Sequence, residues 1–239
     1  MPAKPCRPAS RPDRLPAEGR PDTGLPRKRI IYAVKPAIAQ PRSTSVALQR
    51  LLLELRACTI CSARLPLPPR PVLQVGAAAR ILIAGQAPGR KVAASGVPFD
   101  DASGDRLRAW MGIDKAGFYD PDFIAILPMG FCYPGTGTSG DLPPRPECAA
   151  TWRARLLEQL PSIRLTLVVG THAQAWHLKP EGTGANLTAT VGAWREHGAR
   201  VLPLPHPSPR NNGWLKRNPW FEADVLPELK TRVRALQGR

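Results

Sequence analysis

The chain has 239 residues, 43% of them hydrophobic, which is enough for one sizeable folded domain and an additional short segment. Its 34 Lys and Arg against 18 Asp and Glu give a formal charge of +16, which predicts a polyanionic partner such as nucleic acid, although Arg-rich usage can also be a genome-wide habit. No apolar run is long enough to span a bilayer and no signal-peptide core is found, so we expect a cytoplasmic protein without a membrane partner.

Residues 1–43 have the composition of a disordered tail. They hold nine prolines, and ten Lys and Arg against three Asp and Glu, a formal charge of +7. Such a segment cannot bury enough apolar surface to offset its ordering entropy. It is either a flexible basic arm for nucleic acid or a dispensable tail, and its apolar run at residues 30–34 is a candidate docking segment. We expect the folded domain over residues 44–239.

From Ser45 onward the chain alternates between helical and strand patterns. Ser45 is a candidate N-cap for a helix with apolar residues at helical spacing. Short apolar runs predict strands at residues 81–84, 123–127, 165–169 and up to 204. Helices are predicted at residues 103–112, 149–160, 171–178 and 219–237, the last one kinked or split by Pro227. This alternation predicts an α/β fold, a three-layer α/β/α sandwich around a mostly parallel four-stranded sheet.

Four cysteines form a candidate metal site. Cys58 and Cys61 make a C-x2-C pair, and Cys132 and Cys148 flank a Gly- and Pro-rich loop at residues 130–146. Disulfides are not expected in a reducing compartment. Thiolates at such spacing bind zinc or an iron–sulfur cluster, and the spacing alone does not decide between them. Buried thiols without metal are less favoured, because a long polar loop needs something to hold it.

Two polar stretches follow predicted strands. Residues 85–89 read Gly-Gln-Ala-Pro-Gly and lead to Pro-Phe at residues 98–99, and residues 206–209 read His-Pro-Ser-Pro. Ligands of open α/β sheets bind beyond the carboxyl ends of strands. The two stretches therefore predict one shared site, with ordinary strand-to-helix turns as the alternative.

These two stretches resemble the signature motifs of the uracil-DNA glycosylase superfamily. The order and spacing of the cysteines resemble those of its iron–sulfur members, families four and five. The resemblance covers roughly residues 45–235 and implies a [4Fe–4S] cluster rather than zinc. It also implies a monofunctional hydrolase, expected as a monomer, that flips uracil or another deaminated base out of DNA and hydrolyses its N-glycosidic bond in base-excision repair.

The resemblance also implies roles for individual residues. Phe99 would stack on the flipped base, unless it is simply a core residue. His206 would donate a hydrogen bond to the base oxygen as negative charge develops on the leaving base. Arg210 and Asn211 would face the duplex. The residues expected to contact substrate are Gly85, Gln86, Ala87, Pro88, Phe99, Ser208, Arg210 and Asn211.

The sequence departs from the superfamily pattern at the acidic residue and at base recognition. Other branches carry a carboxylate at the position of Gln86 or Ala87. Asp101, before Ala-Ser-Gly, resembles the family-five acid, so it would position the water and stabilise the cationic sugar, with Asp100 in reserve and helix capping as the alternative.

No Asn precedes Cys132 to read the edge of the base, so hypoxanthine or xanthine are alternatives to uracil as the excised base. The loop before Cys148 contains no His, and we therefore expect no covalent trapping of the substrate. The departures keep a second hypothesis open: a non-catalytic iron–sulfur module of the same fold that binds damaged or single-stranded DNA.

Overall fold

The computed structural model describes residues 45–138, 140–178, 184 and 186–237. The predicted tail, its apolar run and Cys6 lie outside the described residues. Within these ranges, no helix combines the length and the apolar character that crossing a membrane requires.

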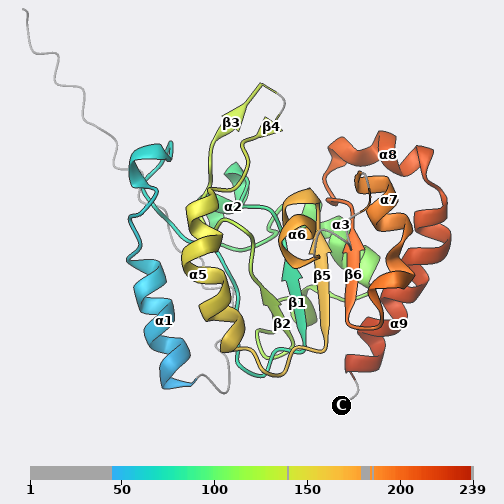
Figure 1. The fold of residues 1–239 in the computed structure, drawn as a ribbon, viewed down its shortest axis with the longest axis horizontal. Coiled ribbons are helices and arrows are strands. Elements are labelled where there is room, and N and C mark those ends of the chain that lie inside the picture. Colours follow the sequence, from blue (N-terminus) through green and yellow to red (C-terminus); the bar gives the residue numbers. More distant parts are fainter. Residues whose placement is uncertain (1–44, 139, 179–183, 185, 238–239) are drawn as a thin grey trace, which may run out of the picture. The chain divides into compact units, whose positions relative to one another are not determined.

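A four-stranded parallel sheet forms the centre of the described chain (Figure 1). The strands lie in the order β2-β1-β5-β6, and every neighbouring pair is parallel. Their bounds are Ile81–Ala84 for β1, Ile124–Ile126 for β2, Leu165–Val169 for β5 and Val201–Leu204 for β6. The prediction of an α/β fold around such a sheet is confirmed.

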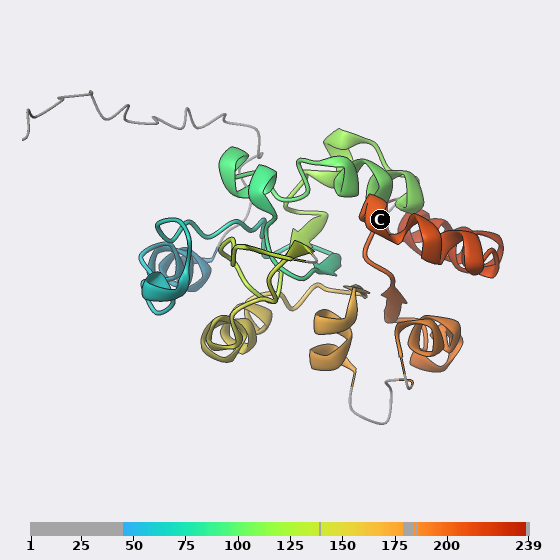
Figure 2. The same ribbon diagram turned by 90° about the horizontal axis from the view of Figure 1, so that it is seen from above.

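Helices cover both faces of this sheet, as the view from above shows (Figure 2). Ile81 and Ile83 pack with α3 and α9 on one face, whereas Leu82 packs with α1 and α5 on the other. This burial of both faces explains why the strands are apolar throughout. The helices are α1 (Val46–Arg56), α2 (Arg90–Ser95), α3 (Ala102–Met111), α4 (Lys115–Phe118), α5 (Pro146–Glu158), α6 (Thr171–His177), α7 (Leu187–Gly192), α8 (Asn212–Arg217) and α9 (Leu226–Gln237).

The structure corrects one sequence-based expectation and adds detail to another. The loop at residues 130–146 contains an antiparallel hairpin of β3 (Thr136–Gly137) and β4 (Gly140–Asp141), whose strands are too short to show a pattern. The closing helix is divided next to Pro227. A π-helical turn at Phe221–Val225 leads directly into α9, in which Pro227 is the second residue.

The strand order places a topological switch between β1 and β5. The chain passes from β1 to β2 on one side and later returns to add β5 and β6 on the other. Ligands of such sheets bind outside the carboxyl ends of the strands at this switch. The loops that follow β1, β5 and β6 therefore meet where a binding site is expected.

Candidate active site

An open cleft with about 1620 Å³ of empty space, counted out to solvent, lies where these loops meet. Its walls come from the loop after β1, the start of α3, the β3–β4 hairpin and the loop after β6. The structure thus brings together every residue that the two motifs nominated as catalytic or substrate-binding. These residues are Gly85, Gln86, Ala87, Pro88, Phe99, Asp101, His206, Ser208, Arg210 and Asn211.

Backbone hydrogen bonds fix the first motif to its neighbour. The carbonyl oxygen of Gly85 accepts from the amide of Met129, and that of Gln86 accepts from the amide of Gly130, both at 2.9 Å. These bonds join the loop after β1 to the loop after β2. Gly89 then starts α2 as its N-cap residue.

Phe99 is both a core contact and a wall of the cleft. Its ring packs edge-on against Phe118, with centroids 6.1 Å apart, and a ring atom lies 3.5 Å from where a Cβ on Gly85 would be. The hydroxyl of Tyr119 donates to the carbonyl oxygen of Pro98 at 3.0 Å. The two sequence-based interpretations of Phe99 are therefore compatible, because the ring is anchored in the core while it lines the cleft.

Asp101 caps α3 and also lines the cleft. Its Oδ1 accepts from the amide of Gly104 at 3.0 Å, which makes it the N-cap residue of α3. Capping thus fixes where the carboxylate stands without removing it from the site. Asp100 is exposed and does not line the cleft, so the geometry favours Asp101 of the two.

His206 is held in one tautomer. The amide of Ser208 donates to His206 Nδ1 at 3.2 Å, and because an amide can only donate, Nδ1 must accept. The neutral ring therefore carries its proton on Nε2. Asn211 Nδ2 also donates to the His206 carbonyl oxygen at 2.7 Å and fixes the loop. Burial lowers the pKa of His206, against the opposing charges of Asp101 and Asp141, so the ring is neutral at pH 7.

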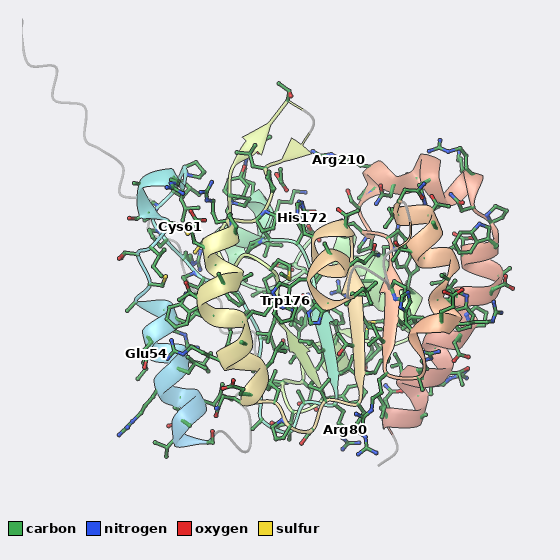
Figure 3. The ribbon with its side chains drawn as sticks, viewed as in Figure 1. Glu54, Cys61, Arg80, His172, Trp176 and Arg210 are labelled. Atoms are coloured by element: carbon green, nitrogen blue, oxygen red, sulfur yellow. The ribbon has the colours of Figure 1, made fainter. Side chains whose placement is uncertain are left out.

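The hairpin contributes cleft residues that the sequence motifs did not reveal. Asp141 and Leu142 line the cleft from β4 and the residue after it, and Lys91 and Ser103 line it from α2 and α3. Arg210 reaches the hairpin from the opposite wall, next to Gly140 (Figure 3). The sequence predicted only a loop at residues 130–146, and no signal in it placed a hairpin over the cleft.

A family model described as the Uracil DNA glycosylase superfamily matches residues 73–230. The chain belongs to this superfamily. Membership establishes a DNA glycosylase-type role and DNA as the substrate. The matched span contains every cleft residue named above, and Cys132 and Cys148, whereas Cys58 and Cys61 precede it.

This superfamily member has a second cavity, lined by Cys58, Cys61, Cys132 and Cys148. All four are free thiols, and the cavity has about 390 Å³ of empty space among mostly apolar side chains. Burial raises the pKa of the Cys132 thiol to about 11 and that of Cys148 to about 12. In the described part of the chain, no three Cys, His, Asp or Glu side chains gather as they would around a single metal ion.

Ion pairs fasten the two sides of this cysteine cavity. Glu147, next to Cys148, pairs with Arg64 from the turn after Cys61 and with Arg145 at 2.9 Å. The amide of Phe131 donates to the sulfur of Cys148 at 3.4 Å. The glycosylase fold thus brings thiols from α5, from the loop after β2 and from the segment after α1 to one place.

Proposed function

We propose that the protein excises uracil or another deaminated base from DNA and so initiates base-excision repair, acting as a monomeric, monofunctional glycosylase. The observation that carries the proposal is the orientation of His206 in the cleft. Its Nδ1 is occupied by the Ser208 amide, so Nε2–H is the donor that remains, and no described residue accepts from it. A fixed, neutral donor is suited to stabilising the negative charge of a leaving base.

The other cleft residues supply the remaining requirements of the reaction. The ring of Phe99 offers a stacking surface for the flipped base. Asp101, held by its capping bond, would orient the attacking water. The glycosidic bond breaks with its electron pair on the base, the water oxygen bonds to C1′, and the water proton leaves through the carboxylate to solvent. Arg210 and Lys91, at the cleft, would contact the phosphates that flank the flipped nucleotide.

Base release from synthetic DNA tests this function. Single- and double-stranded oligonucleotides carrying uracil, hypoxanthine or xanthine would be incubated with anaerobically purified protein, and alkali would reveal abasic sites. Release should be lost in His206→Ala and retained in His172→Ala, because His172 does not line the cleft. Wild-type protein that binds the DNA but releases none of the bases would favour the non-catalytic binding module, which the absence of a carboxylate at Gln86 and Ala87 also allows.

We also propose that Cys58, Cys61, Cys132 and Cys148 hold a [4Fe–4S] cluster. Four free thiols that line one mostly apolar cavity support it. When bound, the cluster supplies iron–thiolate bonds that cross-link three segments of the chain. Iron, sulfide and zinc contents of the protein test the proposal. Cys132→Ala should lose iron and lower the melting temperature, whereas Cys6→Ala should change neither.

A further inference from the structure

Two carboxylates of the described residues line the cleft, and the second is Asp141 of the hairpin. Its Oδ2 lies 3.1 Å from where a Cβ on Gly89 would be, so β4 places this carboxylate against the first motif. The negative charges of Asp141 and Asp101 both act to raise the pKa of His206, against the larger effect of burial, which lowers it. The site therefore presents carboxylates from two separate elements toward the group expected to hold the base.

The hairpin positions this carboxylate, which belongs to an exposed residue. Thr136 Oγ1 donates to Asp141 Oδ1 at 3.4 Å, and Thr136 is itself hydrogen-bonded to the hydroxyl of the buried Tyr133. The amide of Leu142 donates to the carbonyl oxygen of Gly135 at 2.8 Å. No described residue donates to Oδ2, which remains available to a ligand in the cleft.

The negative charge of Asp141 is unexpected in a cleft that binds DNA. The chain carries +16 and its substrate is a polyanion, so a carboxylate at the cleft mouth weakens DNA binding by repelling phosphates. The neighbouring Arg210 lies against Gly140, one residue before Asp141. A carboxylate at this position would, however, stabilise positive charge that develops during the reaction. In N-glycoside hydrolysis, that positive charge develops on the sugar ring.

We propose that Asp141 is a second catalytic carboxylate, which faces the deoxyribose of the flipped nucleotide and stabilises the positive charge that develops there as the glycosidic bond breaks. This inference rests on the proposed glycosylase function. Asp101 orients the water and takes its proton, His206 stabilises the departing base, and Asp141 acts on the sugar between them. The second carboxylate compensates for the uncharged side chains of Gln86 and Ala87 in the first motif.

Single-turnover base release and DNA affinity of Asp141→Asn test this role. The rate constant should fall about 10²-fold, as on removal of one preorganised electrostatic group. Affinity for lesion-containing DNA should stay equal or become tighter, because a charge that repels phosphates is removed. Asp224→Asn, at an exposed position of the π-helical turn before α9, makes the same change of net charge away from the cleft and should keep the wild-type rate.

One further variant and a pH–rate profile test the position of the carboxylate on its hairpin. Thr136→Val keeps the charge but removes its hydrogen bond, and should reduce the rate less than Asp141→Asn. In Asp141→Asn, loss of the carboxylate should lower the pKa of His206 further and move the acid limb of the pH–rate profile to lower pH. This shift tests whether the Asp141 carboxylate lies close enough to act on His206, and an unchanged acid limb would contradict that proximity.

The outcomes distinguish the proposed role of Asp141 from the proposed glycosylase function. A wild-type rate in Asp141→Asn, with release abolished in His206→Ala, overturns the role of Asp141 and leaves the glycosylase intact. Equal losses of rate, affinity and melting temperature in Asp141→Asn also overturn it, because they indicate a collapsed hairpin. Absence of release by the wild-type protein on every lesion overturns both.

Discussion

The backbone conformation of Phe99, which lines the cleft, depends on the glycine at position 104. Its φ of 55° lies in the left-handed region, which few residues with a side chain adopt. Gly104 permits the conformation, since a Cβ there would lie 1.8 Å from the Phe99 carbonyl oxygen. Gly104→Ala should therefore displace Phe99 from the cleft and lower the free energy of unfolding by about 1–3 kcal/mol. Denaturant melts and single-turnover base release would measure both effects.

A matched glycine change serves as the control for this prediction. At Gly213 in α8, a Cβ would meet only the far end of the Arg217 side chain, at 3.4 Å. Gly213→Ala should leave stability and base release close to those of the wild type, since a flexible side chain can move aside. Similar losses in the two variants would contradict the role assigned to the close approach at Gly104.

The ionisation of His206 also belongs to the scale of single residues. Burial lowers its pKa, so the ring takes up a proton at a lower pH than an ordinary histidine, whose pKa is about 6.5, does. Protonation at lower pH puts a proton on Nδ1, which then faces the donating amide of Ser208. Single-turnover base release should therefore fall as pH decreases, with its midpoint below about pH 6.5. A rate that already halves at or above that pH would show that the ring is not neutral as described.

At the scale of elements, a buried arginine joins three parts of the fold. Arg153 of α5 is fully buried and donates to the carbonyl oxygens of Leu127 and Pro128, just after β2. It also donates to His177 Nε2 of α6, and its guanidinium lies 5.0 Å from the ring centroid of Trp176. Because Pro128 lines the cleft, this arrangement supports one wall of the site.

The same contact predicts how stability depends on pH. Burial, and then the charge of Arg153, lowers the pKa of His177 to about 3. The unfolded chain binds a proton at this histidine below about pH 6.5 and the folded chain does not, so the free energy of unfolding should fall as pH drops from about 6.5 toward 3, by up to about 1.4 kcal/mol per unit.

A comparison of variants isolates this contribution. His177→Gln should show a shallower dependence of the unfolding free energy on pH than the wild type in urea melts between pH 7 and 4. His172→Gln changes a histidine of the same helix that makes no contact with Arg153, and it should keep most of the wild-type slope. Parallel slopes in the wild type and His177→Gln would contradict the lowered pKa.

The elements differ in how well their sequences predict them. Strand β5 was predicted with its observed bounds, and Ser45 caps α1 as expected, because an apolar run and a capping side chain act locally. The short helices α2, α4, α7 and α8 were not predicted, since six residues or fewer give too little periodicity. The β3–β4 hairpin depends on tertiary contacts such as that between Arg210 and Gly140, which no local pattern contains.

At the scale of the whole molecule, topology explains why the candidate site was predictable in part. Residues 85–89 and 206–209 are far apart in sequence, but both follow parallel strands, and parallel strands end at the same edge of the sheet. That rule alone brings His206 and Gln86 into one cleft. It gives no information about Asp141, which comes from outside the sheet. The position of that second carboxylate could be found only in the structure.

The positive charge of the chain leads to a prediction about how the affinity for DNA depends on salt concentration. Each phosphate contact made by Lys or Arg contributes about 0.9 to the slope of log affinity against log salt. If the basic N-terminal segment contacts DNA, replacing Arg27 and Arg29 with Ser should flatten that slope by up to about 1.8 and leave single-turnover base release unchanged. Titrations of lesion-containing DNA between low and physiological salt would measure the slope.

A second pair of substitutions provides the reference for this titration. Arg164 and Arg200 are exposed and immediately precede β5 and β6, so they lie at the amino ends of the strands, opposite the cleft. Replacing both with Ser removes the same net charge without removing phosphate contacts, and the slope should stay at the wild-type value. If the two double variants flatten the slope equally, the effect is one of net charge. If only the change at Arg27 and Arg29 flattens it, that segment contacts the DNA directly, because counterion release counts local contacts.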